Sequence, residues 1–210
     1  LADIESMEHL LCSMGVEVSR RNGRMFIDPS TLRWTEAPYD IVRKMRASFF
    51  VLGPLLAKYG HARVSLPGGC AIGTRPVDYH ITLLKGLGAD VETAHGYVTA
   101  ITDRLRGGRL RLPQPSVGAT VTALCAACLA RGKTVLETAA REPEIEDLAS
   151  FLNTMGARIS GAGSEKVTVH GVRKLHGGKY QVMADRIEAG TFMVAGAVGG
   201  GPVEISGCDP

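Results

Sequence analysis

One sequence pattern occurs three times along the chain, and this internal repeat constrains the fold more than any other feature. Gly15, Gly88 and Gly156 stand 73 and then 68 residues apart, and each follows a stretch with apolar residues at helical spacing. A glycine directly after such a stretch is typical of a helix C-terminus, because glycine adopts a positive φ without strain. The sequence therefore predicts three equivalent helices that end at these glycines.

Each predicted helix is followed by two segments that alternate between apolar and polar residues, as β-strands do. The first segments begin near residues 16, 89 and 157, and the second comprise residues 25–27, 97–101 and 166–169. Another pattern recurs at the same period: Arg46, Ser116 and Arg186 stand 70 and 70 residues apart, and each opens a helix of small and apolar residues. Those helices run to glycines near 60, 132 and 200, and predicted strands follow at residues 62–66, 134–138 and 203–206.

The repeat length separates two kinds of architecture. A unit of about 70 residues is too long for a solenoid repeat. We therefore expect an α/β fold in which small units with helices and strands pack around a common axis. The 210 residues suffice for one ordinary domain or two small ones.

Composition excludes several classes of function. The net charge of +3 suits anionic small ligands. The sequence lacks the clustered lysines and arginines of a nucleic-acid-binding protein. No apolar run approaches the ~20 residues of a membrane span, and no signal-peptide pattern is visible at the start. Five cysteines, an odd number, favour a reducing cytosol over a disulfide scaffold.

Cys125 and Cys128 form a C-x-x-C pair, a spacing found in metal and redox sites. The run around them is small and apolar, and no second cysteine pair or histidine cluster accompanies it. We therefore interpret both, and likewise Cys12 and Cys208, as buried packing residues. No cluster in the chain has metal-ligand spacing, so we expect neither a metal nor a cofactor.

A glycine-rich loop with one cysteine and one arginine is the strongest candidate for a chemical site. Residues 66–78 read LPGGCAIGTRPVD. The glycines let a ligand approach the backbone closely, and Cys70 has no bulky neighbour on either side. Arg75 is a permanent cation that favours the thiolate and can hold an anionic substrate. On these residues alone, a surface turn that happens to contain a cysteine is an equally good interpretation.

This loop closely resembles that of the UDP-N-acetylglucosamine 1-carboxyvinyltransferase family, the enolpyruvyl transferases that begin bacterial peptidoglycan synthesis. Residues 39–48, 116–121, 140–145 and 185–192 resemble the family too, in its order and at its spacing. The resemblance implies an inside-out α/β barrel of repeated units, with helices inside, sheets outside and the active site between two domains. On that template, residues 1–184 form the cysteine-loop domain, with an incomplete first repeat and complete repeats at 46–115 and 116–184. Residues 185–210 would begin the second domain.

The resemblance implies a role for each matching residue. Cys70 would be the general acid that protonates the methylene carbon of phosphoenolpyruvate, and it would also form a covalent adduct with it. Arg46 and Arg75 would contact the substrates. The other substrate-binding residues implied are Pro76, Val77, Asp78, Tyr79, Ser116 and Val117.

Within that set, the resemblance divides the nucleotide sugar between two segments. Asp78 would accept a hydrogen bond from uracil and Tyr79 would offer an apolar face, although Asp78 can also cap the following helix. Ser116 and Val117 would bind the diphosphate at a helix N-terminus.

Two residues, Tyr79 and Gln114, differ from common forms of the family, and a third, His80, interrupts the apolar pattern of the repeat. Members often carry leucine where this chain has Tyr79, and some carry lysine where it has Gln114. His80 falls at an apolar position of the repeat helix, aligned with Met7 and Leu148, so we expect a core or boundary histidine.

The implied reaction transfers the enolpyruvyl group of phosphoenolpyruvate to the 3-hydroxyl of UDP-N-acetylglucosamine and releases phosphate. It would take place in the bacterial cytoplasm, without a metal, by an enzyme that is the target of fosfomycin. The family's Lys-Asn pair would precede Leu1, and an aspartate and two arginines would follow Pro210, so these 210 residues alone are expected to be inactive.

Three alternatives stay open at this point. The first is a 5-enolpyruvylshikimate-3-phosphate synthase, which shares the fold but lacks the cysteine loop. The second is a paralogue that binds the nucleotide sugar without catalysis. The third is an RNA-cyclase-like binding module, although nothing in this sequence resembles its nucleotide site.

Overall fold

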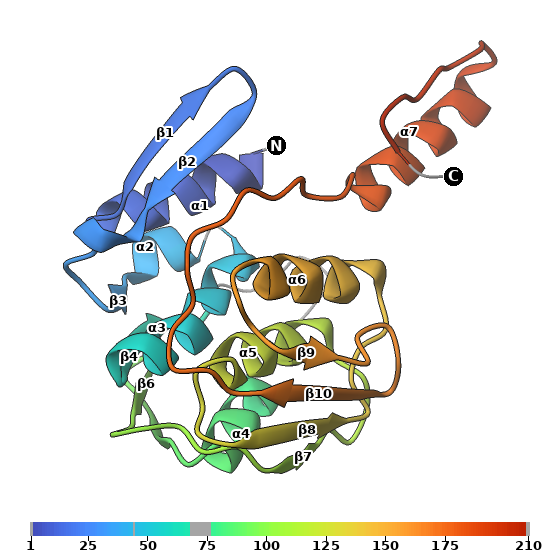
Figure 1. Cartoon of the computed structure of the whole chain (residues 1–210). Coiled ribbons are helices and arrows are strands. Elements are labelled where there is room, and N and C mark those ends of the chain that lie inside the picture. Colours follow the sequence, from blue (N-terminus) through green and yellow to red (C-terminus); the bar gives the residue numbers. More distant parts are fainter. Residues whose placement is uncertain (1, 44, 68–76, 209–210) are drawn as a thin grey trace. The chain divides into compact units, whose positions relative to one another are not determined.

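A computed structural model describes residues 2–43, 45–67 and 77–208, which belong to two compact units, Leu1–Gly177 and Gly178–Pro210 (Figure 1). The helices of the first unit are α1 (Ala2–Ser13), α2 (Tyr39–Val42), α3 (Leu52–Tyr59), α4 (Asp78–Gly86), α5 (Val117–Ala127) and α6 (Pro143–Thr154), with 3₁₀ turns η1 (Pro29–Thr31) and η2 (Arg46–Val51). Its strands are β1 (Glu17–Arg21), β2 (Arg24–Asp28), β3 (Glu36–Ala37), β4 (His61–Ser65), β5 (Asp90–Ala94), β6 (Tyr97–Ile101), β7 (Arg109–Arg111), β8 (Lys133–Glu137), β9 (Ile159–Ser160) and β10 (Lys166–His170). The second unit holds α7 (Arg186–Gly199).

The predicted repeat is confirmed. Helices α1, α4 and α6 end just before Gly15, Gly88 and Gly156, whose φ angles are 88°, 87° and 95°. A two-stranded hairpin follows each glycine: β1–β2, β5–β6 and β9–β10. Each copy therefore has the same order of helix, glycine and hairpin.

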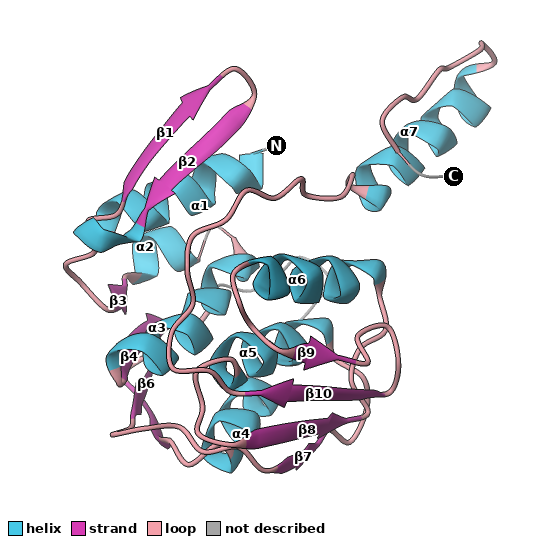
Figure 2. Ribbon diagram, viewed as in Figure 1, coloured by secondary structure: helices cyan, strands magenta, loops and turns pink. Residues whose placement is uncertain are grey.

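Two four-stranded sheets join successive repeats. Their strand orders are β3-β4-β6-β5 and β7-β8-β10-β9, and the second sheet can be followed in Figure 2. In both sheets the first two strands are parallel and the other pairs are antiparallel. Strands β3 and β7 close one repeat but hydrogen-bond to the next, so the sheets cross the boundaries at 45/46 and 115/116. At two and three residues, these strands are too short to show a periodicity in the sequence.

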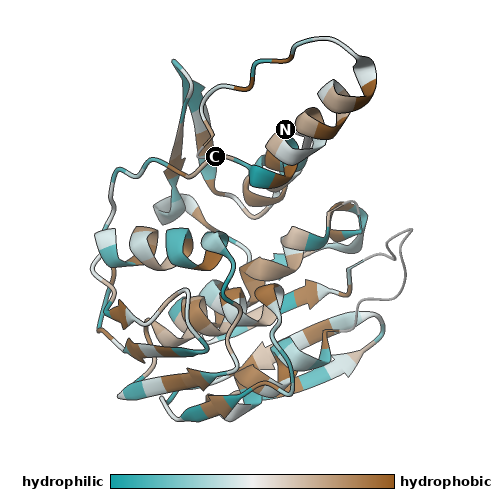
Figure 3. Cartoon of the chain, turned by 90° about the vertical axis from the view of Figure 1, so that its right-hand side faces the viewer, coloured by the Kyte–Doolittle hydropathy of each residue, from teal (hydrophilic) through white to brown (hydrophobic). Residues whose placement is uncertain are grey.

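Helix α5 is the packing centre of the first unit. It contacts α3, α4 and α6, and most of its residues are buried, with the partly buried Val117, Gly118, Val121 and Cys125 on one face. The outer sheets show the complementary pattern, with hydrophobic and hydrophilic residues alternating along the strands (Figure 3). This arrangement confirms the predicted α/β class, with helices packed against one another and sheets covering them.

In the second unit, α7 forms as predicted, but the strand expected at residues 203–206 is wrong. Asp185 caps α7 by accepting hydrogen bonds from the backbone N–H groups of Ile187 and Glu188, at 2.9 and 3.0 Å. After the helix the chain folds back, so that a Cβ built on Gly196 would lie 2.9 Å from Val203 Cγ2. Val203 thus lies against α7, and the unit's described residues contain no strand that could pair with residues 203–206.

Candidate functional site

The structure describes six of the nine predicted site residues. Cys70, Arg75 and Pro76 lie outside the described residues. Arg46 opens η2, and Ser116 is the N-cap of α5, which Val117 begins. Val77 is the N-cap of α4, and Asp78 and Tyr79 are the first residues of that helix. The predicted residues thus stand at the starts of three elements far apart in sequence.

These three segments meet around His80, whose side chain is 3% exposed. Its ring packs edge-on against Phe49 of η2, with 5.1 Å between the ring centroids, and is stacked with Phe50 at 6.5 Å. Its Nδ1 atom lies 2.8 Å from Thr122 Oγ1 of α5. A Cβ built on Gly118 of α5 would lie 3.1 Å from His80 Nε2. The expected core position of His80 is confirmed, whereas its link to α5 was not visible in the sequence.

A narrow crevice beside this ring is lined by Arg46, Phe49, Phe50, Pro67, Val77 and His80. It has no room for a water molecule, so it is a packing contact and not a ligand pocket. Pro67 and Val77 are the described residues on either side of the segment 68–76. Both ends of the predicted cysteine loop are therefore held at η2 and the start of α4.

The electrostatics of this contact favour a neutral imidazole. Burial, and secondly the charge of Arg46, lower the pKa of His80 to about 4, while Asp78 acts in the opposite direction. At neutral pH the ring is uncharged, and a positive charge beside it belongs to Arg46. Such a cation at the start of a helical element suits an anionic ligand.

The start of α5 has the features of an anion-binding helix terminus. Ser116 accepts a hydrogen bond from the backbone N–H of Ala119 at 3.4 Å through its side-chain oxygen. The N–H groups of a first helical turn have no partners within the helix, and the helix dipole adds positive potential there. Gln114, two residues earlier, is exposed.

The alternative role of Asp78 as a helix cap is wrong. The N-cap of α4 is Val77, and no side chain caps this end of the helix. Asp78 comes one residue later, is exposed, and complements the helix dipole from the first turn. Asp78 is thus exposed to solvent next in sequence to Val77, which lines the crevice.

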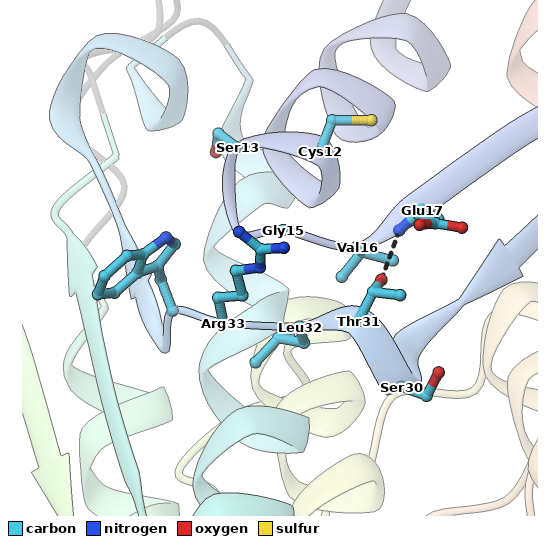
Figure 4. A pocket seen from close by; sticks show the side chains of 10 residues that line it. Cys12, Ser13, Gly15, Val16, Glu17, Ser30, Thr31, Leu32 and Arg33 are labelled. Atoms are coloured by element: carbon cyan, nitrogen blue, oxygen red, sulfur yellow. Dashed lines mark hydrogen bonds between the residues drawn. The ribbon is translucent and has the colours of Figure 1, made fainter.

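A larger hollow of about 690 Å³ lies elsewhere in the first unit (Figure 4). Cys12, Ser13 and Gly15 face Thr31, Leu32 and Arg33 across it. The backbone N–H groups of Arg33 and Trp34 donate to Met14 O, and Thr31 Oγ1 accepts from Glu17 N at 2.9 Å. No predicted site residue lines this hollow.

The described cysteines divide by environment. Cys128 is buried and Cys125 is partly buried against the core, and burial raises the pKa of both to about 12, as expected of packing residues. The prediction that Cys12 is buried is wrong, because it lies on the solvent face of α1, opposite Leu10 and Met14. Cys208 is half-buried.

Residues 2–43, 45–67 and 77–208 hold no group of three or more histidine, cysteine, aspartate or glutamate side chains that could bind a metal ion. None of their helices is long and apolar enough to span a bilayer.

Solved structures define the class of this fold. The enolpyruvyl transferase NikO from Streptomyces tendae superposes with a TM-score of 0.79 at 24% identity, over 93% of this chain and 47% of that one. An EPSP synthase from Acinetobacter baumannii gives 0.69 at 23% identity, over 93% and 45%. The fold is that of the enolpyruvyl transferases.

Sequence comparison narrows the class to a family. The chain belongs to the EPSP synthase (3-phosphoshikimate 1-carboxyvinyltransferase) family, whose model matches residues 1–210. It is 54% identical over 204 residues to the UDP-N-acetylglucosamine 1-carboxyvinyltransferase of Yersinia pestis (strain Pestoides F), and equally to that of Yersinia pseudotuberculosis serotype O:1b (strain IP 31758). These alignments cover 97% of this chain and 49% of each relative, so the chain spans about half the length of the curated relatives it matches.

Proposed function

We propose that the protein transfers the enolpyruvyl group of phosphoenolpyruvate to the 3-hydroxyl of UDP-N-acetylglucosamine and releases phosphate, in the first committed step of peptidoglycan synthesis. The observation that carries this proposal is the 54% identity over 97% of the chain with relatives of that name. The intact LPGGCAIGTRPVD segment supports it against the shikimate enzyme, which lacks this loop.

The proposed division of labour follows the three segments. Cys70 protonates the methylene carbon of phosphoenolpyruvate and can form an adduct with it, and Arg75 contacts both substrates. Arg46 adds a second cation. The nucleotide sugar lies along Pro76, Val77, Asp78 and Tyr79 at its uracil end and along Ser116 and Val117 at its diphosphate. The crevice at His80 supports this proposal, since it brings Arg46, Val77 and the first turn of α5 to one place.

The wider setting is part of the same proposal. Residues 1–184 are the cysteine-loop domain and residues 185–210 begin the second domain. The partners are the two substrates, and fosfomycin is an inhibitor. The bacterial cytoplasm is the location, which agrees with the free state of the four described cysteines.

Phosphate release tests the reaction. The protein, extended to the length of its relatives, is given phosphoenolpyruvate with either UDP-N-acetylglucosamine or shikimate 3-phosphate. We expect turnover with the nucleotide sugar only, a loss of at least about a hundredfold in Cys70→Ala, and no effect of Cys12→Ala. The 210 residues alone should give no turnover.

Each other outcome points to a different protein. Turnover with shikimate 3-phosphate alone would assign the chain to the shikimate enzymes. Binding of UDP-N-acetylglucosamine without phosphate release would identify a non-catalytic paralogue. Turnover by the 210 residues alone would overturn the proposed need for the second domain.

A further inference from the structure

The contact around His80 connects three elements through one side chain. The residue belongs to α4, its ring packs on Phe49 and Phe50 of η2, and its Nδ1 bonds to Thr122 of α5. Each element begins with residues proposed to bind substrate. The placement of those residues relative to one another therefore depends on how this ring is held.

The hydrogen bond to Thr122 is the directional part of this contact. Ring packing against two phenylalanines has little directional preference, whereas a 2.8 Å bond between Nδ1 and Oγ1 favours one position and one orientation of the ring. Thr122 is fully buried, so no water can replace its hydroxyl. Loss of that hydroxyl would leave a buried ring nitrogen without its partner.

Thr122 is itself held firmly. It lies where α5 crosses α3, and a Cβ built on Gly53 would come within 2.7 Å of its carbonyl oxygen and 3.3 Å of its Cγ2. The residue that holds His80 thus belongs to a close crossing of α3 and α5. A rigid support of this kind transmits the position of α5 to the start of α4.

We infer that Thr122 is a positioning residue for the nucleotide-sugar site: by holding His80, it sets the start of α4 against the first turn of α5 and against η2. The inference rests on the proposed function, and it gives Thr122 no contact with substrate. It predicts that the hydroxyl contributes to affinity for UDP-N-acetylglucosamine more than to the chemical step.

Two substitutions at Thr122 isolate the hydroxyl. Thr122→Val replaces it by a methyl group of similar size and keeps the Cγ2 that packs toward Gly53. Thr122→Ser keeps the hydroxyl. The matched control is Thr120→Val, because Thr120 is also fully buried in α5 but its Oγ1 accepts from Ala140 N, at 3.1 Å, and does not bond to His80.

Steady-state kinetics of the protein extended to its relatives' length give the first readout. We expect Thr122→Val to raise the KM for UDP-N-acetylglucosamine about tenfold with kcat changed less than about twofold. Thr122→Ser and Thr120→Val should leave this KM near the wild-type value. An unchanged KM in Thr122→Val, or an equal rise in Thr120→Val, would overturn the inference.

Amide hydrogen exchange gives a second readout that needs no substrate. The Ile81 N–H bonds to Val77 O at 3.1 Å and the Thr120 N–H to Ser116 O at 3.0 Å, so they report on the first turns of α4 and α5. We expect faster exchange at Ile81 and Thr120 in Thr122→Val, with β8 and β10 unchanged.

Unchanged exchange at both amides would contradict the anchoring role, whatever the enzyme's activity. If the wild-type protein turned over no UDP-N-acetylglucosamine, the proposed function would fail. Exchange would then decide the anchoring role alone.

Discussion

At the scale of single residues, the core position of His80 could be predicted from the sequence, but its hydrogen-bond partner could not. Its alignment with Met7 and Leu148 in the repeat predicts a core position, which the structure confirms. Its bond to Thr122 could not be predicted, because the partner lies 42 residues away on another helix and a threonine among small residues gives no signal. The prediction of a buried Cys12 is wrong, because this residue lies on the solvent face of α1.

The depressed pKa of His80 makes stability depend on pH. Because the folded-state pKa is about 4 and the unfolded value near 6.5, the unfolded chain binds the extra proton between these values. The contribution of the neutral His80 to stability is therefore fully present above pH 6.5 and is lost as the pH falls toward 4. When the pH is lowered from 7.5 to 4.5, we expect the free energy of unfolding, measured by urea titration, to fall by roughly 2 kcal/mol more in the wild type than in His80→Gln. Equal losses in the two proteins would show that His80 is not buried neutral.

The cysteines give a residue-level test of burial. We expect a thiol reagent at pH 7.5 to label Cys12 of the folded chain rapidly and to leave Cys125 and Cys128 unlabelled, because burial raises the pKa of both to about 12. Peptide mass spectrometry identifies the labelled sites, and urea-unfolded chain is the control in which all should react. Fast labelling of Cys125 in the folded chain would contradict the packing of α5.

At the scale of elements, a helical period followed by a glycine predicted helices and hairpins correctly, whereas the shortest strands were missed and one alternating segment was wrongly predicted as a strand. Helices α1, α4 and α6 and their hairpins carry both an apolar period and a terminal glycine, and all were predicted. Strands β3 and β7 were missed, because two or three residues cannot show a period. The strand predicted at residues 203–206 has the alternation but no strand beside it, since a strand needs a hydrogen-bonded neighbour as well as a pattern.

The crossing of α3 and α5 is the element contact most sensitive to size. A Cβ on Gly53 would lie 2.7 Å from the backbone oxygen of Thr122, which cannot move without shifting α5. We expect Gly53→Ala to lower the free energy of unfolding by about 1–3 kcal/mol, measured by urea titration. Gly86→Ala is the control, because its Cβ would meet only the movable end of Leu110. A Gly53→Ala variant as stable as the wild type would contradict this close approach.

At the scale of the whole molecule, the repeats are interlocked units and not independent modules. Each four-stranded sheet takes its first strand from the repeat before it, and ion pairs join that strand to the next: Glu36 with Arg63 and Arg109 with Glu137. The repeat and the α/β class were predictable from the sequence, whereas this exchange of strands was not. The meeting of segments near residues 46, 77 and 116 likewise depends on the packing of α5, which sequence spacing does not encode.

We propose that these three segments form one nucleotide-sugar site. Hydrogen exchange of the protein extended to its relatives' length, measured with and without UDP-N-acetylglucosamine, shows whether all three respond to the ligand. We predict slower exchange in the segments around residues 46–51, 77–81 and 116–119 together, with strands β8 and β10 unchanged as the internal reference. Slower exchange in only one of the segments, or at the hollow near Arg33 instead, would contradict the account.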